Sequence, residues 1–133
     1  MSDALAPEYI LVIEDDEHIG EVIAMILTDE GYDVTSVRDG HAALRMIERQ
    51  SPALILLDLS IANPGPERTI EAYRQTASGL AKVVVVSGHA NLELRARAIG
   101  ADAFVAKPFD IPILVETVQG VLSMKQQVGD RVM

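Results

Sequence analysis

The sequence lacks cysteine, holds few basic residues and has no long apolar run, and each absence removes a class of function. Without cysteine, no disulfide, thiolate-bound metal or cysteine nucleophile can form. Lys and Arg number 11 against 20 Asp and Glu, and the formal net charge of -9 argues against a protein that mainly binds the nucleic-acid phosphate backbone. The same balance suits a protein that recruits cations or basic partners.

The apolar runs and the N-terminus also lack the marks of membrane insertion or export. Every apolar run is far shorter than the about 18–20 residues that a membrane-spanning helix needs. Residues 1–8 contain Asp3 and Glu8 and no basic residue, which is unlike a signal peptide. We therefore expect a cytoplasmic protein without membrane insertion. The 133 residues, of which 49% are hydrophobic, predict one domain with its own core.

Five short segments have the composition of strands in a parallel sheet. Short continuous apolar runs rich in β-branched residues are typical of strands that are buried on both faces. One of the five segments alternates more and fits an edge strand. The predicted strands are Ile10–Ile13, Asp33–Val37 (the edge strand), Ala53–Leu57, Val83–Val86 and Ala103–Ala106.

Helical patterns lie between and after these strands. Asp16, Asp39 and Asp110 stand where they can cap three of the helices. The third helix has the thinnest apolar stripe. The order, a strand followed by a helix five times over, predicts an α/β fold with helices on both faces of a parallel sheet. The predicted helices are Ile19–Leu27, His41–Arg49, Glu67–Ala77, Asn91–Ile99 and Ile111–Leu122.

Polar residues follow four of the predicted strands directly. Glu14 and Asp15 come after the first strand, and Asp58 comes after the third. Ser87 ends the fourth strand and Lys107 follows the fifth. Each alone is explained by a helix cap, a turn or a solvated side chain. Because ligands of doubly wound sheets bind at the carboxyl ends of the strands, the set together predicts a site.

The residue types at this edge indicate phosphoryl chemistry. Clustered carboxylates need a hard cation, most plausibly Mg²⁺. The Asp58 carboxylate can act as a nucleophile towards phosphorus and form an acyl phosphate. A metal ion and the Lys107 ammonium can neutralise the phosphoryl oxygens, the Ser87 hydroxyl can donate a hydrogen bond, and Gly88 leaves room beside them.

Four segments resemble the receiver domain of bacterial two-component response regulators. The resemblance spans residues 9–125 and leaves 1–8 as an N-terminal extension and 126–133 as a tail or the start of a linker. It implies a flavodoxin-like, doubly wound fold with five strands in the order 2-1-3-4-5. The segments are Ile10–Glu17 (ILVIEDDE), Leu54–Leu59 (LILLDL), Val83–Gly88 (VVVVSG) and Gly100–Phe109 (GADAFVAKPF).

By this resemblance, the acidic residues and the lysine form a phosphorylation site. Asp58 matches the phosphoacceptor, which a sensor histidine kinase or a histidine phosphotransfer protein would load. Asp15 matches the direct Mg²⁺ ligand and Glu14 the acid that holds metal-bound water, while the backbone carbonyl of Ser60 would add a ligand. Lys107 matches the lysine that pairs with the phosphoryl group. The resemblance thus implies a Mg²⁺-dependent signalling switch with slow self-dephosphorylation, not an enzyme for other substrates.

Further matches imply how the phosphate is read out. Ser87 matches the hydroxyl residue that moves to bond it, and Phe104 the aromatic switch residue that turns inward. We expect readout through the surface of the fourth helix, fifth strand and fifth helix, to a downstream protein or a second copy, without direct nucleic-acid binding by this domain. Gly88 and His89 are candidate modulators, although a solvated loop histidine is the alternative interpretation of His89.

The segment after Asp58 departs from the family pattern. Where the family usually has Met-Pro and then Asp-Gly, this chain has Ile61-Ala62 followed by Asn63-Pro64-Gly65-Pro66. We therefore expect a rearranged or shortened start of the third helix, and a weaker case for a ligand from Ser60.

Two other classes of function stay open. One is a phosphorylation-independent scaffold for protein interactions that has kept the fold. The other is an Asp-nucleophile phosphatase of the haloacid dehalogenase type. That family has Asp-x-Asp at its nucleophile, whereas Asp58 is followed by Leu59 and Ser60, and 133 residues leave no room for a cap domain.

Overall fold

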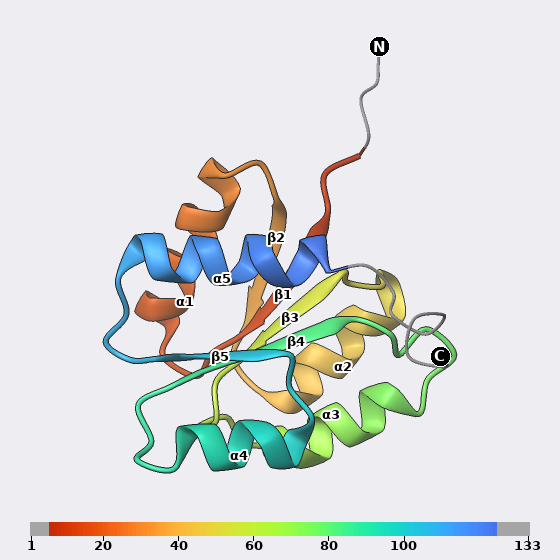
Figure 1. The fold of residues 1–133 in the computed structure, drawn as a ribbon. Coiled ribbons are helices and arrows are strands. Elements are labelled where there is room, and N and C mark those ends of the chain that lie inside the picture. The colour runs from red at the N-terminus through yellow and green to blue at the C-terminus, as the bar shows by residue number, and fades with distance from the viewer. Residues whose placement is uncertain (1–5, 125–133) are drawn as a thin grey trace, which may run out of the picture.

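The computed structural model describes residues 6–124 as a five-stranded parallel sheet with helices on both faces (Figure 1). The strand order β2-β1-β3-β4-β5 confirms the predicted doubly wound, flavodoxin-like fold. Strands and helices alternate as predicted. The strands are β1 (Tyr9–Ile13), β2 (Asp33–Val37), β3 (Leu54–Leu57), β4 (Lys82–Ser87) and β5 (Ala103–Ala106); the helices are α1 (Glu17–Asp29), α2 (Gly40–Arg49), α3 (Pro66–Arg74), α4 (Leu92–Ile99) and α5 (Ile111–Ser123).

The described residues stop just after α5. The predicted tail at 126–133 lies outside them, as do residues 1–5 of the predicted N-terminal extension. No helix within 6–124 is both long enough and apolar enough to cross a bilayer.

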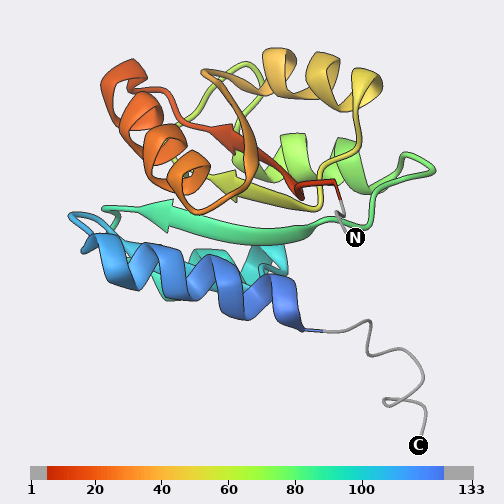
Figure 2. The ribbon, with the colours of Figure 1, turned by 90° about the horizontal axis from the view of Figure 1, so that it is seen from above.

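Two apolar cores lie on opposite faces of the sheet, because successive side chains of a strand point to opposite sides. Along β1, Leu11 and Ile13 pack with α2, α3 and α4, whereas Ile10 and Val12 pack with α1 and α5. Figure 2 shows α1 and α2 on one side of the molecule and α4 and α5 on the opposite side. Burial on both faces is the reason that β1, β3 and β4 are continuous apolar runs.

Aspartate side chains cap the first two helices as predicted. The Asp16 carboxylate accepts a hydrogen bond from the Ile19 N–H at 3.1 Å, and Asp39 accepts one from the Ala42 N–H at 2.8 Å. Asp110 stands at the corresponding position before α5, but its side chain makes no capping hydrogen bond. Asp110 thus occupies the predicted N-cap position of α5, but the prediction of a capping hydrogen bond from its side chain is wrong.

The rearrangement expected after Asp58 is confined to the loop before α3. Asn63 has a φ of 54°, and the Asn63–Pro64 peptide bond is cis. The helix itself is regular from Pro66, one residue before its predicted start, and it ends at Arg74 instead of Ala77. The early end has a packing cause, because the backbone of Gly79 folds back so closely that a Cβ there would lie 2.8 Å from the Arg74 Cα.

Two buried tyrosines give opposite expectations for the loss of a hydroxyl. The Tyr73 hydroxyl accepts a hydrogen bond from the Ala81 N–H at 2.8 Å and donates one to the Ser78 carbonyl at 3.0 Å. Tyr73→Phe removes both bonds and leaves the Ala81 N–H without a partner, whereas the Ser78 carbonyl keeps its hydrogen bond from the Leu80 N–H. We therefore expect the free energy of unfolding to fall by about 1–3 kcal/mol. The Tyr9 hydroxyl is buried without a hydrogen-bond partner among residues 6–124, so Tyr9→Phe should preserve or raise stability. Urea unfolding of both variants checks this, and equal losses would contradict it.

Candidate functional site

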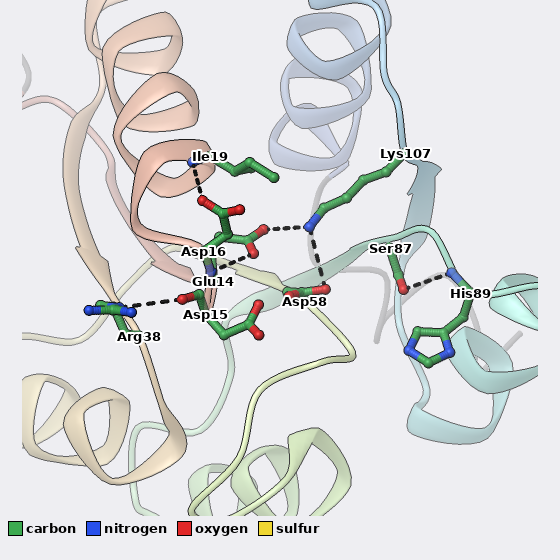
Figure 3. Close-up of polar contacts among 9 residues, drawn as sticks. All are labelled: Glu14, Asp15, Asp16, Ile19, Arg38, Asp58, Ser87, His89 and Lys107. Carbon is green, nitrogen blue, oxygen red and sulfur yellow. Dashed lines mark hydrogen bonds and ion pairs between the residues drawn. The ribbon is translucent and has the colours of Figure 1, made fainter.

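The register of the parallel strands brings the predicted site residues together (Figure 3). Ile13 at the end of β1 pairs with Leu57 at the end of β3, so the following residues, Glu14 and Asp58, emerge side by side. The Asp58 N–H donates a hydrogen bond to the Ile13 carbonyl at 2.9 Å, which fixes where Asp58 leaves the sheet. Lys107 follows β5 and extends its ammonium group to the same edge.

Glu14, Asp15 and Asp58 form a carboxylate cluster. One oxygen of each lies within 4.8 Å of the others. Glu14 and Asp58 are only 2% and 3% exposed, whereas Asp15 is exposed. Like charges at this separation repel unless a proton or a cation neutralises them. Carboxylate oxygens are the ligands that hard divalent cations prefer, so the cluster has the donor set of such a site.

The Lys107 ammonium neutralises part of this cluster. Its Nζ lies 2.7 Å from Glu14 Oε1 and 3.6 Å from Asp58 Oδ1. The other Glu14 oxygen accepts a hydrogen bond from the Asp16 N–H at 3.1 Å. Asp58 Oδ2, by contrast, is buried without a hydrogen-bond partner in the part of the chain that the structure describes. A buried polar atom of this kind needs a partner, and an ion bound at the cluster would supply one.

Burial has a large effect on the protonation of Asp58. It is the main reason that the pKa of Asp58 is raised to about 7; contacts with the Asp15 and Glu14 carboxylates add to the rise, and the Lys107 charge opposes it. The pKa of Asp15 is lowered, chiefly by the neighbouring Asp58 carboxyl group. As the pH rises, Asp15 therefore loses its proton before Asp58 does.

Ser87 lies at the end of β4 and is fully buried. Its Oγ accepts a hydrogen bond from the His89 N–H at 3.2 Å, a contact that Figure 3 shows beside Asp58. Gly88 is exposed, and a Cβ there would meet nothing closer than Lys107 Cβ at 3.8 Å. His89 is exposed and takes part in this contact through its backbone.

Two other predicted residues, Phe104 and Ser60, are exposed. Phe104 on β5 is 42% exposed, so its ring lies outside the core. Ser60 is exposed in the loop after β3 and lies beside Asp15 at the edge of the sheet. Ser60 and Asp15 line a shallow hollow together with Arg38, Asp39, Ala62 and Asn63.

Arg38 is a neighbour of the site that the sequence analysis did not identify. Its Nε donates a hydrogen bond to the Asp15 carbonyl at 3.3 Å, and its Nη1 lies 3.8 Å from a Glu17 oxygen. The sequence does carry a signal, because Arg38 directly follows β2 and so lies at the same edge of the sheet. Both charged groups are exposed, so the ion pair itself contributes little to stability.

Comparison with known proteins gives one consistent family. A family model described as the response regulator receiver domain matches residues 10–119. The chain is 31% identical over 132 residues to the transcriptional regulatory protein PdtaR of Mycobacterium tuberculosis, covering 96% of this chain and 62% of PdtaR. It is 30% identical to the sensory transduction protein RegX3 of the same species, covering 85% of this chain and 50% of RegX3. The chain thus spans less than two thirds of the length of these relatives.

Solved structures give the same result. NtrX of Brucella abortus is 30% identical, with a TM-score of 0.80 over 87% of this chain and 27% of NtrX. A response regulator receiver domain protein of Methanospirillum hungatei is 29% identical, with a TM-score of 0.78 over 87% of this chain and 94% of that protein.

The raised pKa of Asp58 makes the stability of the metal-free protein depend on pH. The folded state holds the Asp58 proton more tightly than the unfolded chain does, so the resulting stabilisation is complete below about pH 4 and is lost as the pH rises through about 7. Asp58→Asn stays neutral throughout. At pH 8 we expect this variant to be more stable than the native protein by on the order of a few kcal/mol, with a smaller difference at pH 5.

Urea unfolding in a chelating buffer at the two pH values measures this difference. Asp110→Asn is the matched control, because it removes an exposed carboxylate away from the cluster and should change little. An Asp58→Asn difference that is equal at both pH values would contradict the raised pKa.

Proposed function

The chain belongs to the response regulator receiver family, and from this premise we propose that it is a signalling switch that accepts a phosphoryl group on Asp58. The observation that supports this role is the buried Asp58 carboxylate, with one oxygen facing Lys107 at 3.6 Å and the other without a partner among the described residues. A nucleophile needs such a free oxygen, and the phosphoryl group needs such a cation nearby. The proposed donor is a sensor histidine kinase or a histidine phosphotransfer protein.

We propose that the carboxylate cluster binds Mg²⁺ as its cofactor. Asp15 and Asp58 would be direct ligands, Glu14 would hold metal-bound water, and the Ser60 carbonyl would add a further oxygen. The three carboxylates within 4.8 Å and the unpaired Asp58 Oδ2 support this assignment. When bound, Mg²⁺ supplies positive charge that offsets both the carboxylates and the phosphoryl oxygens.

The proposed reaction follows from the positions of these groups. An oxygen of ionised Asp58 attacks phosphorus, a P–O bond forms, and the P–N bond to the donor histidine breaks with protonation of the leaving imidazole. Lys107 balances charge on the new phosphoryl oxygens, and Ser87 donates a hydrogen bond to one of them. Dephosphorylation is a hydrolysis: a water molecule attacks phosphorus, the P–O bond to Asp58 breaks, and phosphate and the Asp58 carboxylate are released.

We propose that the phosphate is read out through α4, β5 and α5. Phosphorylation adds roughly −1.5 to −2 charge at the edge of the sheet, where Ser87 can turn towards it. The exposed Phe104 ring would then move into the space beside β4 that Ser87 vacates. The surface also carries the exposed apolar residues Leu94, Ile111 and Ile113, which suit contact with a downstream protein or a second copy. His89 is proposed only as a modulator of access to the phosphate.

Covalent labelling tests the proposed function directly. With a small phosphodonor such as acetyl phosphate and Mg²⁺, the native protein should gain one phosphoryl group by intact mass, and Asp58→Asn should gain none. Asp58→Glu should be a poor substitute, because a displacement on the order of 1 Å can cost ~100-fold in rate. Asp110→Asn serves as the matched control and should label normally.

The other outcomes identify the alternatives. A folded native protein that is never labelled would be a scaffold that works without phosphorylation. Continuous release of phosphate over many turnovers, without accumulation of labelled protein, would indicate a phosphatase. Labelling of Asp58→Asn at the native rate would show that another residue is the acceptor.

Amide chemical shifts test the proposed readout. Beryllofluoride mimics the phosphoryl group, so its addition should shift residues at the edge of the sheet and also those of α4, β5 and α5 around Phe104. Ser87→Ala should keep the changes at the edge and lose most of those on this surface. If the largest distant changes fall in residues 61–71 instead, the readout runs through the loop before α3 and through α3 itself.

A further inference from the structure

We propose that Gly40, the first residue of α2, is a positioning residue for the metal site. Gly40 acts through the 60–65 loop, which follows Asp58 and begins with Ser60. The inference rests on the proposed function, since it concerns how that site binds Mg²⁺. Its basis is the close contact between the N-terminus of α2 and this loop.

Backbone hydrogen bonds attach the 60–65 loop to α2. The Gly40 N–H donates to the Ala62 carbonyl at 3.0 Å, and the His41 N–H donates to the Asn63 carbonyl at 2.7 Å. A helix leaves the N–H groups of its first turn without partners inside the helix. Here two of these groups hold the loop, so the start of α2 and the loop share one fixed position.

The absence of a side chain at Gly40 allows this contact. A Cβ there would lie 2.6 Å from the Pro64 carbonyl oxygen and 2.7 Å from Pro64 Cδ, and it would also collide with Thr69 Oγ1. Gly40 does not have a positive φ, so glycine is needed for space and not for its backbone conformation. Because the Pro64 carbonyl belongs to the backbone, it cannot rotate away from a methyl group, and the loop must move.

Thr69 of α3 holds the other side of the same loop. It is fully buried, and its hydroxyl donates to the Gly65 carbonyl at 2.9 Å and lies 3.4 Å from the Pro64 carbonyl. The loop is therefore hydrogen-bonded to α2 on one side and to α3 on the other. Its first residue, Ser60, lines the hollow beside Asp15. A displacement at Pro64 changes the geometry that Ser60 offers to an ion at the carboxylate cluster.

The nature of the ion makes this effect specific. Mg²⁺ requires near-ideal octahedral geometry at about 2.0–2.1 Å, whereas Ca²⁺ accepts flexible geometry at about 2.3–2.6 Å. A loop that is held slightly out of place should therefore weaken Mg²⁺ binding more than Ca²⁺ binding. A general loss of stability would not change the preference between the two ions.

Calorimetric titration of the folded, metal-free protein with each ion tests the proposal. Gly40→Ala should raise the Kd for Mg²⁺ by about 10-fold or more, as removal of a supporting contact around a metal site typically does. The Kd for Ca²⁺ should rise less. Gly65→Ala is the matched control in the same loop, because a Cβ there would meet only the Ile61 carbonyl, at 4.0 Å, and this variant should bind as the native protein does.

A second pair of variants keeps the test valid if Gly40→Ala does not fold. Thr69→Val removes the hydroxyl that holds the loop and should also raise the Kd for Mg²⁺, whereas Thr69→Ser keeps the hydroxyl and should restore it. Native Mg²⁺ affinity in Gly40→Ala, or an equal loss in Gly65→Ala, overturns the role of Gly40. Failure of the native protein itself to bind Mg²⁺ overturns the metal site of the proposed function instead.

Discussion

Two buried carboxylates, Glu14 and Asp58, share the ammonium group of Lys107, and the properties of the site follow from this imbalance of charge. An unpaired charge in a protein interior costs several kcal/mol. Lys107 lies 2.7 Å from Glu14 and neutralises it, whereas the pKa of Asp58 is raised to about 7, chiefly by burial. The resting site is thus incomplete in charge and in hydrogen bonds. A ligand that supplies positive charge or hydrogen bonds therefore gains more binding free energy here than at a site whose polar groups are already paired.

The sheet makes this unfavourable arrangement possible. Glu14 and Asp58 each follow a strand whose side chains are buried on both faces. The change from an apolar to a charged side chain takes a single residue, from Ile13 to Glu14 and from Leu57 to Asp58. The apolar residues hold the strand ends in a fixed register. Stability that comes from the core therefore supports local destabilisation at the edge, which is a common relation between scaffold and functional site.

Most of the fold and of the site could be predicted because both depend on local patterns. Apolar runs identify strands that are covered on both faces, and parallel topology places the residues after Ile13 and Leu57 at the same edge of the sheet. The strand order, which makes them neighbours, is implied by the family resemblance. The other features depend on contacts between distant segments. Arg38 approaches Asp15 because β2 lies next to β1, and α3 ends early because Gly79 packs on it. Local patterns do not specify these contacts, although the position of Arg38 directly after β2 places it at the same edge of the sheet.

The loop after Asp58 shows the same limit at the site itself. Its Pro and Gly content predicted a departure from the usual path, and the structure places that departure at Asn63 and the following cis bond. Hydrogen bonds from the start of α2 and from Thr69 of α3 hold the loop there, and the missing side chain of Gly40 leaves space for the contact with α2. The sequence does not show why position 40 must be glycine. The reason is the close approach of the loop, which only the packed structure reveals.

The contact between α3 and α4 joins the segment that we propose for the readout of a phosphate on Asp58 to the segment that is the alternative route. The Arg74 guanidinium donates hydrogen bonds to the carbonyls of Ile99 and Gly100, at the end of α4. Nearer the site, Arg95 of α4 pairs with Glu67 of α3 at 2.8 Å, and this contact lowers the pKa of the Glu67 carboxyl. Two side-chain contacts therefore join the helices, one at the end of α4 and one at its middle, so we expect a displacement of α4 to act on α3 as well. Whichever of the two moves first, the other shares in the change, because packed elements respond together and not as independent parts.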